Sequence, residues 1–119
     1  MPYQQWCVRN RATQGFRLNS GHAYEGILAA NAEQFAAHPE FFAEIDGQRR
    51  TTGGDLKFCI SNAQLRKLVA DHAVRTISAN PNLDSISMDP SDGGNWCSCD
   101  ACLEMGSVSD RALTLANDV

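Results

Sequence analysis

The sequence has no long apolar run and no long basic run, and both absences limit what it can bind. No apolar stretch approaches the roughly 20 residues that a membrane-spanning helix needs. No run of Lys or Arg is longer than the pair Arg49 and Arg50, and the formal net charge is -4. We therefore expect no membrane and no nucleic acid among the partners, and small or neutral partners fit better.

A secretory signal and a disulfide framework are also missing. The N-terminus from Met1 to Trp6 lacks the charged and then apolar pattern of an export signal. Five cysteines are more than usual for a cytosolic domain of this size, yet too few and too clustered for a disulfide-stapled miniprotein. The cysteine content therefore does not indicate whether the protein works in a reducing or an oxidising cell compartment. The chain does have 119 residues, 43% of them hydrophobic, which suits one globular domain over residues 1–119.

Strand-like and helix-like segments alternate along the chain. Alternation of apolar and polar residues predicts strands, and apolar residues every three or four positions predict helices. We expect strands at residues 16–19, 56–60 and 85–88, and helices after Asn31, from Ala63 to Ala79, and after Ser109. This order is typical of βαβ units with a parallel sheet. The predicted fold class is α/β, either part of a barrel or a small domain that covers its sheet edges by self-association into a homo-oligomer.

Two local predictions depend on turn and cap residues. Asp46 and Gly47 separate two strand-like runs and favour a type I′ turn, so we expect an inserted β-hairpin there. Asn62 is a suitable N-cap for the long helix that follows it. Leu65 and Val69 begin an apolar stripe on that helix, which should face a core.

A polar loop follows the last predicted strand and runs from Asp89 to Trp96. Pro90 ends the strand because it cannot donate to a ladder, and Gly93 permits positive φ. Asp89 and Asp92 then lie at a strand's carboxyl end, where barrel enzymes place catalytic groups. Glycoside hydrolysis needs two carboxyl groups, so both aspartates are candidate catalytic residues. The alternative is a simple turn whose Asp side chains bond their own backbone.

Three other side chains are candidate substrate-binding groups. Trp96 could stack on a sugar ring, or it could cover the cysteine cluster as a core residue. His22 and Tyr24 follow the first predicted strand, in a loop where they could hydrogen-bond sugar hydroxyls. A structural role is the alternative for His22.

Four cysteines are candidate metal ligands. Cys97, Cys99 and Cys102 form a C-x-C-x-x-C motif, and Cys59 could be the fourth ligand. Four thiolates in tetrahedral geometry suit a structural Zn²⁺ ion and leave no open position for chemistry. The alternative is disulfide pairing, for example between Cys59 and one of the other three. Cys7 is expected to be an unpaired bystander.

Several of these segments together resemble a bacterial family known as domain of unknown function 4838. The matching segments are His38 to Ala43, Asp46 to Arg49, Phe58 to Asn62, Ser87 to Gly94 and Trp96 to Cys102. The resemblance implies a glycoside-hydrolase-like (β/α)8 barrel and a carbohydrate-related role, usually within larger exported proteins. This chain would then be a fragment of the barrel. Hydrolysis would need residues from the absent strands, so we expect the isolated chain to be inactive.

Two functions from different classes follow as hypotheses. In the first, the chain is a glycoside-hydrolase-like segment whose acidic residues face a sugar. In the second, it is a non-catalytic module, clamped by its cysteines through zinc or disulfides, that binds a ligand or another copy of itself. A metal-binding domain in which the cysteine cluster is the whole function is a third possibility.

Overall fold

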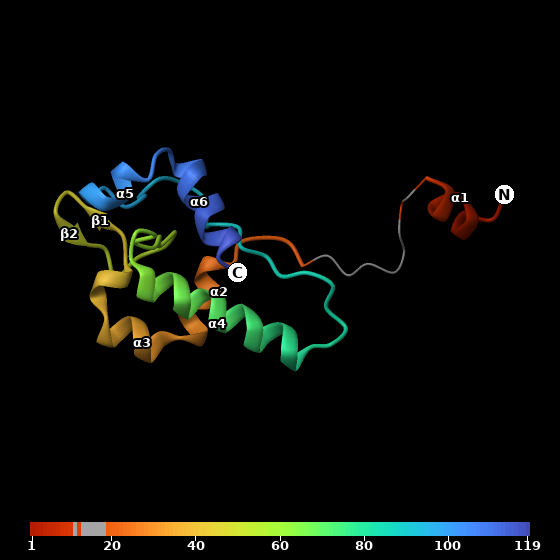
Figure 1. Cartoon of the computed structure of the whole chain (residues 1–119), viewed down its shortest axis with the longest axis horizontal. Helices are drawn as coiled ribbons and strands as arrows, with labels where there is room; N and C mark the ends of the chain where they lie inside the picture. Colours follow the sequence, from red (N-terminus) through yellow and green to blue (C-terminus); the bar gives the residue numbers. More distant parts are fainter. Residues whose placement is uncertain (11, 13–18) are drawn as a thin grey trace.

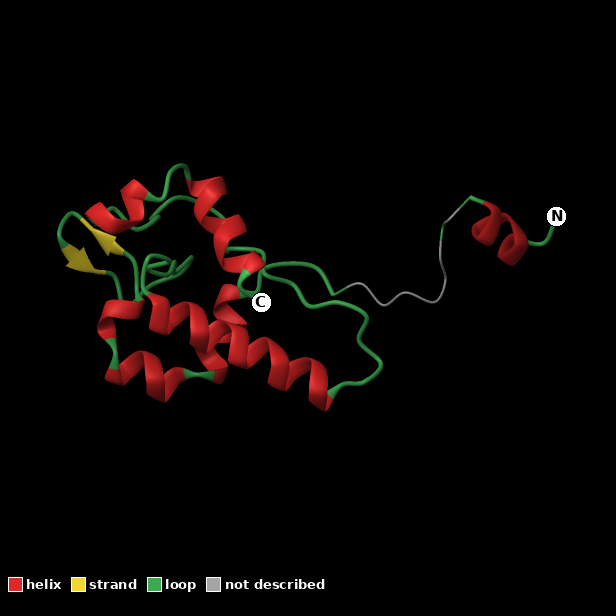
Figure 2. Cartoon of the chain, viewed as in Figure 1, coloured by secondary structure: helices red, strands yellow, loops and turns green. Residues whose placement is uncertain are grey.

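Helices form most of the regular structure in the computed structural model, which describes residues 1–10, 12 and 19–119. Figure 2 shows these helices together with one short pair of strands. In chain order the elements are α1 (Tyr3–Arg9), α2 (Tyr24–Ala30), α3 (Ala32–Ala37), the 3-10 turn η1 (Pro39–Phe41), β1 (Glu44–Ile45), β2 (Gln48–Arg49), α4 (Ala63–Ala79), α5 (Asp100–Glu104) and α6 (Val108–Asn117).

The predicted α/β fold with parallel βα units is wrong. Over the described residues the only sheet is a two-stranded antiparallel pair, and no parallel sheet or barrel is present. An alternating pattern in a short segment reports which side chains are buried, but it does not report whether another strand lies beside the segment. Among the described residues of the expected strands, Phe58 and Ile60 lie in the main core, and Leu56 and Met88 pack against it.

The individual predicted strands show this directly. Within residues 56–60, Phe58 makes one isolated antiparallel bridge with Phe42. Phe58 then packs in the main core rather than in a sheet. Residues 85–88 form no strand, and only the next residue, Asp89, makes an isolated parallel bridge, with His22. The strand expected at 16–19 falls largely outside the described residues.

The long helix α4 has the bounds that the sequence predicts. The side chain of Asn62 caps it by accepting two N–H groups of the first turn, at 2.9 and 3.1 Å. Leu65, Val69 and Ala73 are buried along the predicted stripe. Ile77 is exposed, so the stripe reaches the core only over its first part.

The predicted β-hairpin is also present. β1 and β2 pair antiparallel, with Glu44 opposite Arg49. Asp46 and Gly47 at its tip both have positive φ, of 50° and 77°. Positive φ at both central residues is the requirement of a type I′ turn, so the Asp-Gly pair specifies this hairpin locally.

The main core lies between α4 and the helices α2, α3 and α6. In Figure 1, α3 and α4 lie along one side of the molecule and α5 and α6 along the other, with the hairpin near α5. None of the helices in the described part of the chain has the length and apolarity of a membrane span. The buried residues of this cluster, which we call the apolar core, are Tyr24, Ile27, Phe35, Phe41, Phe42, Phe58, Ile60, Leu65, Val69 and Leu115.

The last helix, α6, begins two residues earlier than expected. Its N-cap is Ser107 rather than Ser109. The Ser107 hydroxyl accepts the N–H of Asp110, whose carboxylate accepts the N–H of Ser107, and together these bonds form a capping box. Arg111 and Leu115 are the buried residues of this helix.

Candidate metal centre

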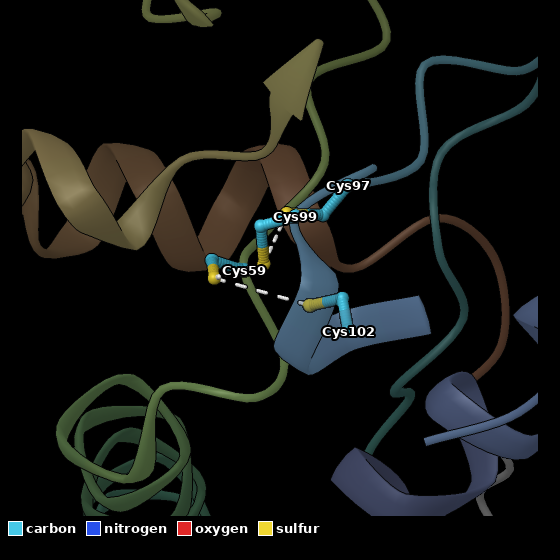
Figure 3. Close-up of side chains that lie close together, drawn as sticks. All are labelled: Cys59, Cys97, Cys99 and Cys102. Atoms are coloured by element: carbon cyan, nitrogen blue, oxygen red, sulfur yellow. Dashed lines mark hydrogen bonds between the residues drawn. The ribbon is translucent and has the colours of Figure 1, made fainter. Parts of the chain in front are cut away.

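The sulfur atoms of Cys59, Cys97, Cys99 and Cys102 converge on one point. All four lie within 4.8 Å of one another. Sγ of Cys59 lies 3.8 Å from that of Cys99 and 3.9 Å from that of Cys102, and Cys97 lies 3.4 Å from Cys99. Figure 3 shows the four side chains pointing toward one another from three parts of the chain. Cys99 is half-buried and the other three are buried.

Residues 41–44, which lead into the hairpin, bond to both of the segments that bring these cysteines together. On one side, Cys59 donates its N–H to the carbonyl of Phe41 at 2.8 Å, and Ala43 donates to Lys57 at 2.9 Å. On the other side, the N–H of Ser98 donates to the carbonyl of Glu44 in β1 at 2.7 Å. These backbone bonds place the segment that contains Cys59 and the loop that contains Cys97 against the same short stretch, residues 41–44, at the start of the hairpin.

The short helix α5 supplies the remaining two sulfurs. Cys99 is its N-cap residue, and Cys102 lies within it. The N–H of Leu103 donates to the carbonyl of Cys99 at 3.0 Å, which closes the first turn around the pair. The C-x-x-C spacing therefore places both side chains on the same side of a single helical turn.

Donors from the protein point at the sulfurs. The backbone N–H of Glu44 donates to Cys97 Sγ at 3.3 Å, and that of Ser61 donates to Cys102 Sγ at 3.4 Å. The guanidinium of Arg49 lies 3.9 Å from Cys97 Sγ and donates to the carbonyl of Phe42 at 2.9 Å. Such donors stabilise negative charge on thiolates, which is the form that metals bind.

The thiols share their protons unequally. A hydrogen bond from Cys97 lowers the pKa of the Cys59 thiol, and bonds from Ser61 and Arg49 lower it further. The same bond raises the pKa of Cys97, and burial raises it as well. Burial also raises the pKa of Cys102. The cluster therefore favours a thiolate at Cys59, with a proton held by its neighbour.

The geometry fits a metal ion bound by four sulfurs. In a tetrahedral Zn²⁺ site with Zn–S bonds of about 2.3 Å, neighbouring sulfurs are separated by about 3.8 Å. Three of the sulfur–sulfur separations, 3.4, 3.8 and 3.9 Å, lie close to this value, and all of them are within 4.8 Å. Cys7, in α1, is buried and is not part of the group.

The loop with the candidate catalytic residues lies at the surface, next to His22. Nε2 of His22 lies 3.2 Å from the carboxylate of Asp92, whose side chain is 86% exposed. Nδ1 of His22 lies 2.7 Å from the carbonyl of Pro90. The bond to Pro90 raises the pKa of His22, and the charge of Asp92 raises it further. Asp89 is exposed, and its carbonyl accepts the N–H of Ala23 at 2.8 Å.

Two other predicted binding residues are placed differently. The expectation that Tyr24 lies in a loop is wrong, since it is the first residue of α2 and is fully buried. It stacks on Phe58 with ring centroids 4.4 Å apart, because its large ring is apolar enough to fill the core. Trp96 is half-buried and packs against the apolar core. Its ring centroid lies 5.8 Å from Nζ of Lys57 and 5.9 Å from the guanidinium carbon of Arg111.

Sequence reasoning missed the buried cations that hold this loop. Nζ of Lys57 is buried and donates to Ser91 Oγ at 3.0 Å and to the carbonyl of Asp92 at 2.8 Å. Burial lowers the pKa of Lys57. Arg111 is also buried and donates to the carbonyl of Cys97 at 2.7 Å. The burial of Arg111 could have been predicted from its place one turn before Leu115 on α6. It was missed because a charged residue usually indicates the solvent-exposed face of a helix.

Fold and site together define a small, mostly helical domain with four clustered cysteines. A comparison with known families matches residues 2–119 to the family described as Domain of unknown function (DUF4838), and the chain belongs to this family. Neither curated proteins nor solved structures give a match. The predicted family is thus confirmed, while its expected barrel is not found in the described residues.

Proposed function

We propose that this chain is a non-catalytic module that binds a structural zinc ion through Cys59, Cys97, Cys99 and Cys102. The convergence of four sulfurs within 4.8 Å of one another carries this proposal. The ion would join three parts of the chain that apolar contacts connect only weakly. These are the segment that contains Cys59, the loop that contains Cys97, and the helix α5 with its N-cap Cys99.

The donor set favours zinc in a structural role. Four soft thiolates at tetrahedral separations select Zn²⁺ over hard cations such as Mg²⁺ or Ca²⁺. Because all four coordination positions would be filled by protein, no water or substrate could bind the metal. The ion would therefore stabilise the fold and would perform no chemistry.

The arrangement of the sulfurs favours a metal over disulfides. Cys59 lies at nearly equal distances from Cys99 and Cys102, whereas a disulfide selects a single partner at about 2.05 Å. All the cysteines are free thiols in the structure. The N–H groups that point at Cys97 and Cys102 would have no anionic acceptor if those sulfurs were oxidised.

Metal content and thiol accessibility, measured together, test this proposal. The chain is refolded with one equivalent of Zn²⁺ and dialysed, and the metal is then measured by elemental analysis. We expect one zinc per chain, and four thiols that react only after denaturation with a chelator. Substitution with Co²⁺ should give the intense thiolate-to-metal absorption of a site with four sulfur ligands.

Two cysteine variants serve as the matched pair. Cys102→Ser should lose zinc binding, because it removes one of four ligands. Cys7→Ser should keep one zinc per chain, because Cys7 lies outside the cluster. A chain that holds no metal under these conditions, or that loses it equally in both variants, contradicts the proposal.

We propose carbohydrate binding at the Asp89–Trp96 loop as a second candidate function. The pairing of His22 with Asp92 supports it, because a predicted binding residue and a predicted catalytic residue from distant segments lie 3.2 Å apart. An exposed carboxylate held by a histidine can accept hydrogen bonds from sugar hydroxyls. The buried ammonium group of Lys57 donates to Ser91 in this loop, which would hold the carboxylate of Asp92 in place.

A glycan-binding assay on the zinc-loaded chain tests this second function. Asp92→Asn should abolish binding to any glycan that the parent chain retains. Asp46→Asn is the matched control, since Asp46 is exposed at the hairpin tip and Asn tolerates its positive φ. If no glycan binds, or if both variants bind equally, this second function is wrong and the metal proposal stands unaffected.

A further inference from the structure

The four ligands of the proposed zinc site differ in exposure. Cys59, Cys97 and Cys102 are buried, and Cys99 alone among the four is half-buried. An oxidant that diffuses in from solvent therefore meets Cys99 first. Metal-bound thiolates remain nucleophilic, so an accessible one can react with a peroxide while the ion is still bound.

Cys99 also has two partners that could complete an oxidation. Its sulfur lies 3.4 Å from Cys97 and 3.8 Å from Cys59. A sulfenic acid formed at Cys99 would thus have a second thiolate beside it, and small side-chain movements would bring the pair to bonding distance. Redox-sensing cysteines commonly combine these two properties, an accessible thiolate and an adjacent resolving thiol.

We propose, resting on the zinc site above, that Cys99 is a peroxide-reactive modification site whose oxidation releases the metal. In the first step the Cys99 thiolate attacks one oxygen of hydrogen peroxide, the O–O bond breaks, hydroxide leaves, and Cys99 becomes a sulfenic acid. In the second step the thiolate of Cys59 or Cys97 attacks the Cys99 sulfur and displaces a second hydroxide. One peroxide is reduced to two hydroxides, and two thiolates are oxidised to one disulfide.

The loss of two ligands ejects the ion. A disulfide sulfur is a poor metal ligand, so one disulfide leaves only two thiolates for Zn²⁺. The ion would join the segment that contains Cys59, the loop that contains Cys97 and α5, so its release would loosen these parts together. Reduction of the disulfide would restore all four thiolates, and zinc could bind again.

The test uses the zinc-loaded Cys7→Ser chain, so that every remaining thiol belongs to the cluster. One equivalent of hydrogen peroxide is added in the presence of a chromogenic zinc indicator, and the disulfides are then mapped by mass spectrometry. We expect one zinc released per peroxide consumed, a disulfide that contains Cys99, and full rebinding after reduction. Zinc retained after the peroxide is consumed, or a first disulfide that lacks Cys99, overturns the inference.

A pair of histidine variants separates the role of Cys99 from that of a ligand in general. Cys99→His keeps four ligands, because Zn²⁺ accepts three cysteines and one histidine, but it removes the accessible sulfur. Cys102→His makes the same change at a buried ligand. We expect the Cys99 variant to release zinc roughly tenfold more slowly than the Cys102 variant. Equal rates contradict the inference, whereas a parent chain that never binds zinc contradicts the proposed function instead.

Discussion

Two regions of the molecule are stabilised by different interactions. The apolar core joins α2, α3, α4 and α6 through ten buried side chains, most of them large and aromatic or branched. The cysteine region has a second cluster with only four buried residues, Ala43, Cys59, Cys97 and Cys102. Burial at about 25 cal/mol per Å² stabilises the first region strongly, and it contributes little to the second, whose side chains are small.

This contrast indicates why the cysteines are grouped where they are. Short loops and a hairpin with two-residue strands cannot bury enough apolar surface to offset the conformational entropy that is lost when they become ordered. Bonds from four sulfurs to one ion can supply the missing free energy in a small volume. Arg111 connects the two regions, since it lies on α6 one turn from Leu115 and donates to the carbonyl of Cys97.

Removal of the metal should have the largest effect on stability, and it should affect the cysteine region more than the apolar core. With EDTA, we expect the free energy of unfolding to fall by about 4 kcal/mol relative to a sample in which free zinc is a thousand times Kd. Hydrogen exchange should accelerate first in the hairpin and α5, while α4 stays protected. Equal acceleration in α4 would mean that the two regions are not independent.

The opposite test weakens the apolar core and leaves the cysteines untouched. Leu65→Ala should lower the free energy of unfolding by about 3 kcal/mol, because Leu65 is fully buried and leaves a cavity. Zinc content of the folded variant should stay at one per chain. Leu103→Ala is the control, since Leu103 is exposed and its loss should change stability by less than about 0.5 kcal/mol.

A smaller effect is expected from the guanidinium beside the sulfurs. Arg49→Met keeps much of the side-chain volume but removes the donor 3.9 Å from Cys97, so zinc affinity should fall by about tenfold. Arg50→Met is the matched control next to β2, because the guanidinium of Arg50 donates to the carbonyl of Gly54 at 3.0 Å. Competition with a chelator of known affinity measures both. An unchanged affinity in the Arg49 variant would assign that residue to the hairpin alone.

The smallest effect concerns a buried hydroxyl in the apolar core. Tyr24 is fully buried, and its hydroxyl has no hydrogen-bond partner among the described residues. Tyr24→Phe should therefore raise the free energy of unfolding by about 1 kcal/mol, because it removes an unsatisfied polar group. Chemical denaturation measures the change, and Tyr3→Phe on exposed α1 should leave stability unchanged. A loss of stability in Tyr24→Phe would indicate a bound water at that hydroxyl.

Prediction from the sequence succeeded where the determinants are local. Asn62 caps α4 through its own side chain, and the Asp46-Gly47 pair adopts the two positive φ values that its hairpin turn requires. The cysteine spacing C-x-C-x-x-C, with Cys59 as a fourth candidate, identified all four members of the cluster. In each case the feature is specified by the residues that form it, so their pattern in the sequence was sufficient to predict it.

Prediction failed where distant segments decide the outcome. Residues 56–60 have a strand-like pattern, but a strand needs a neighbour to bond with, and here Phe58 finds only one bridge before it packs among aromatic rings. Tyr24 and Lys57 look like surface residues in the sequence, and both are fully buried. Their burial depends on partners far along the chain, such as Phe58 for the ring and Ser91 for the ammonium group.

The sequence by itself therefore determined the long helix, the hairpin turn, the family and the set of four cysteines. The tertiary structure alone decided that the chain packs as helices rather than as a parallel sheet, and that the four sulfurs meet at one point. The physical reason is that caps, turns and spacings act over a few residues. Burial, strand pairing and metal geometry depend on contacts between segments that are far apart in the sequence, by 43 residues between Cys59 and Cys102 and by 68 between His22 and Pro90.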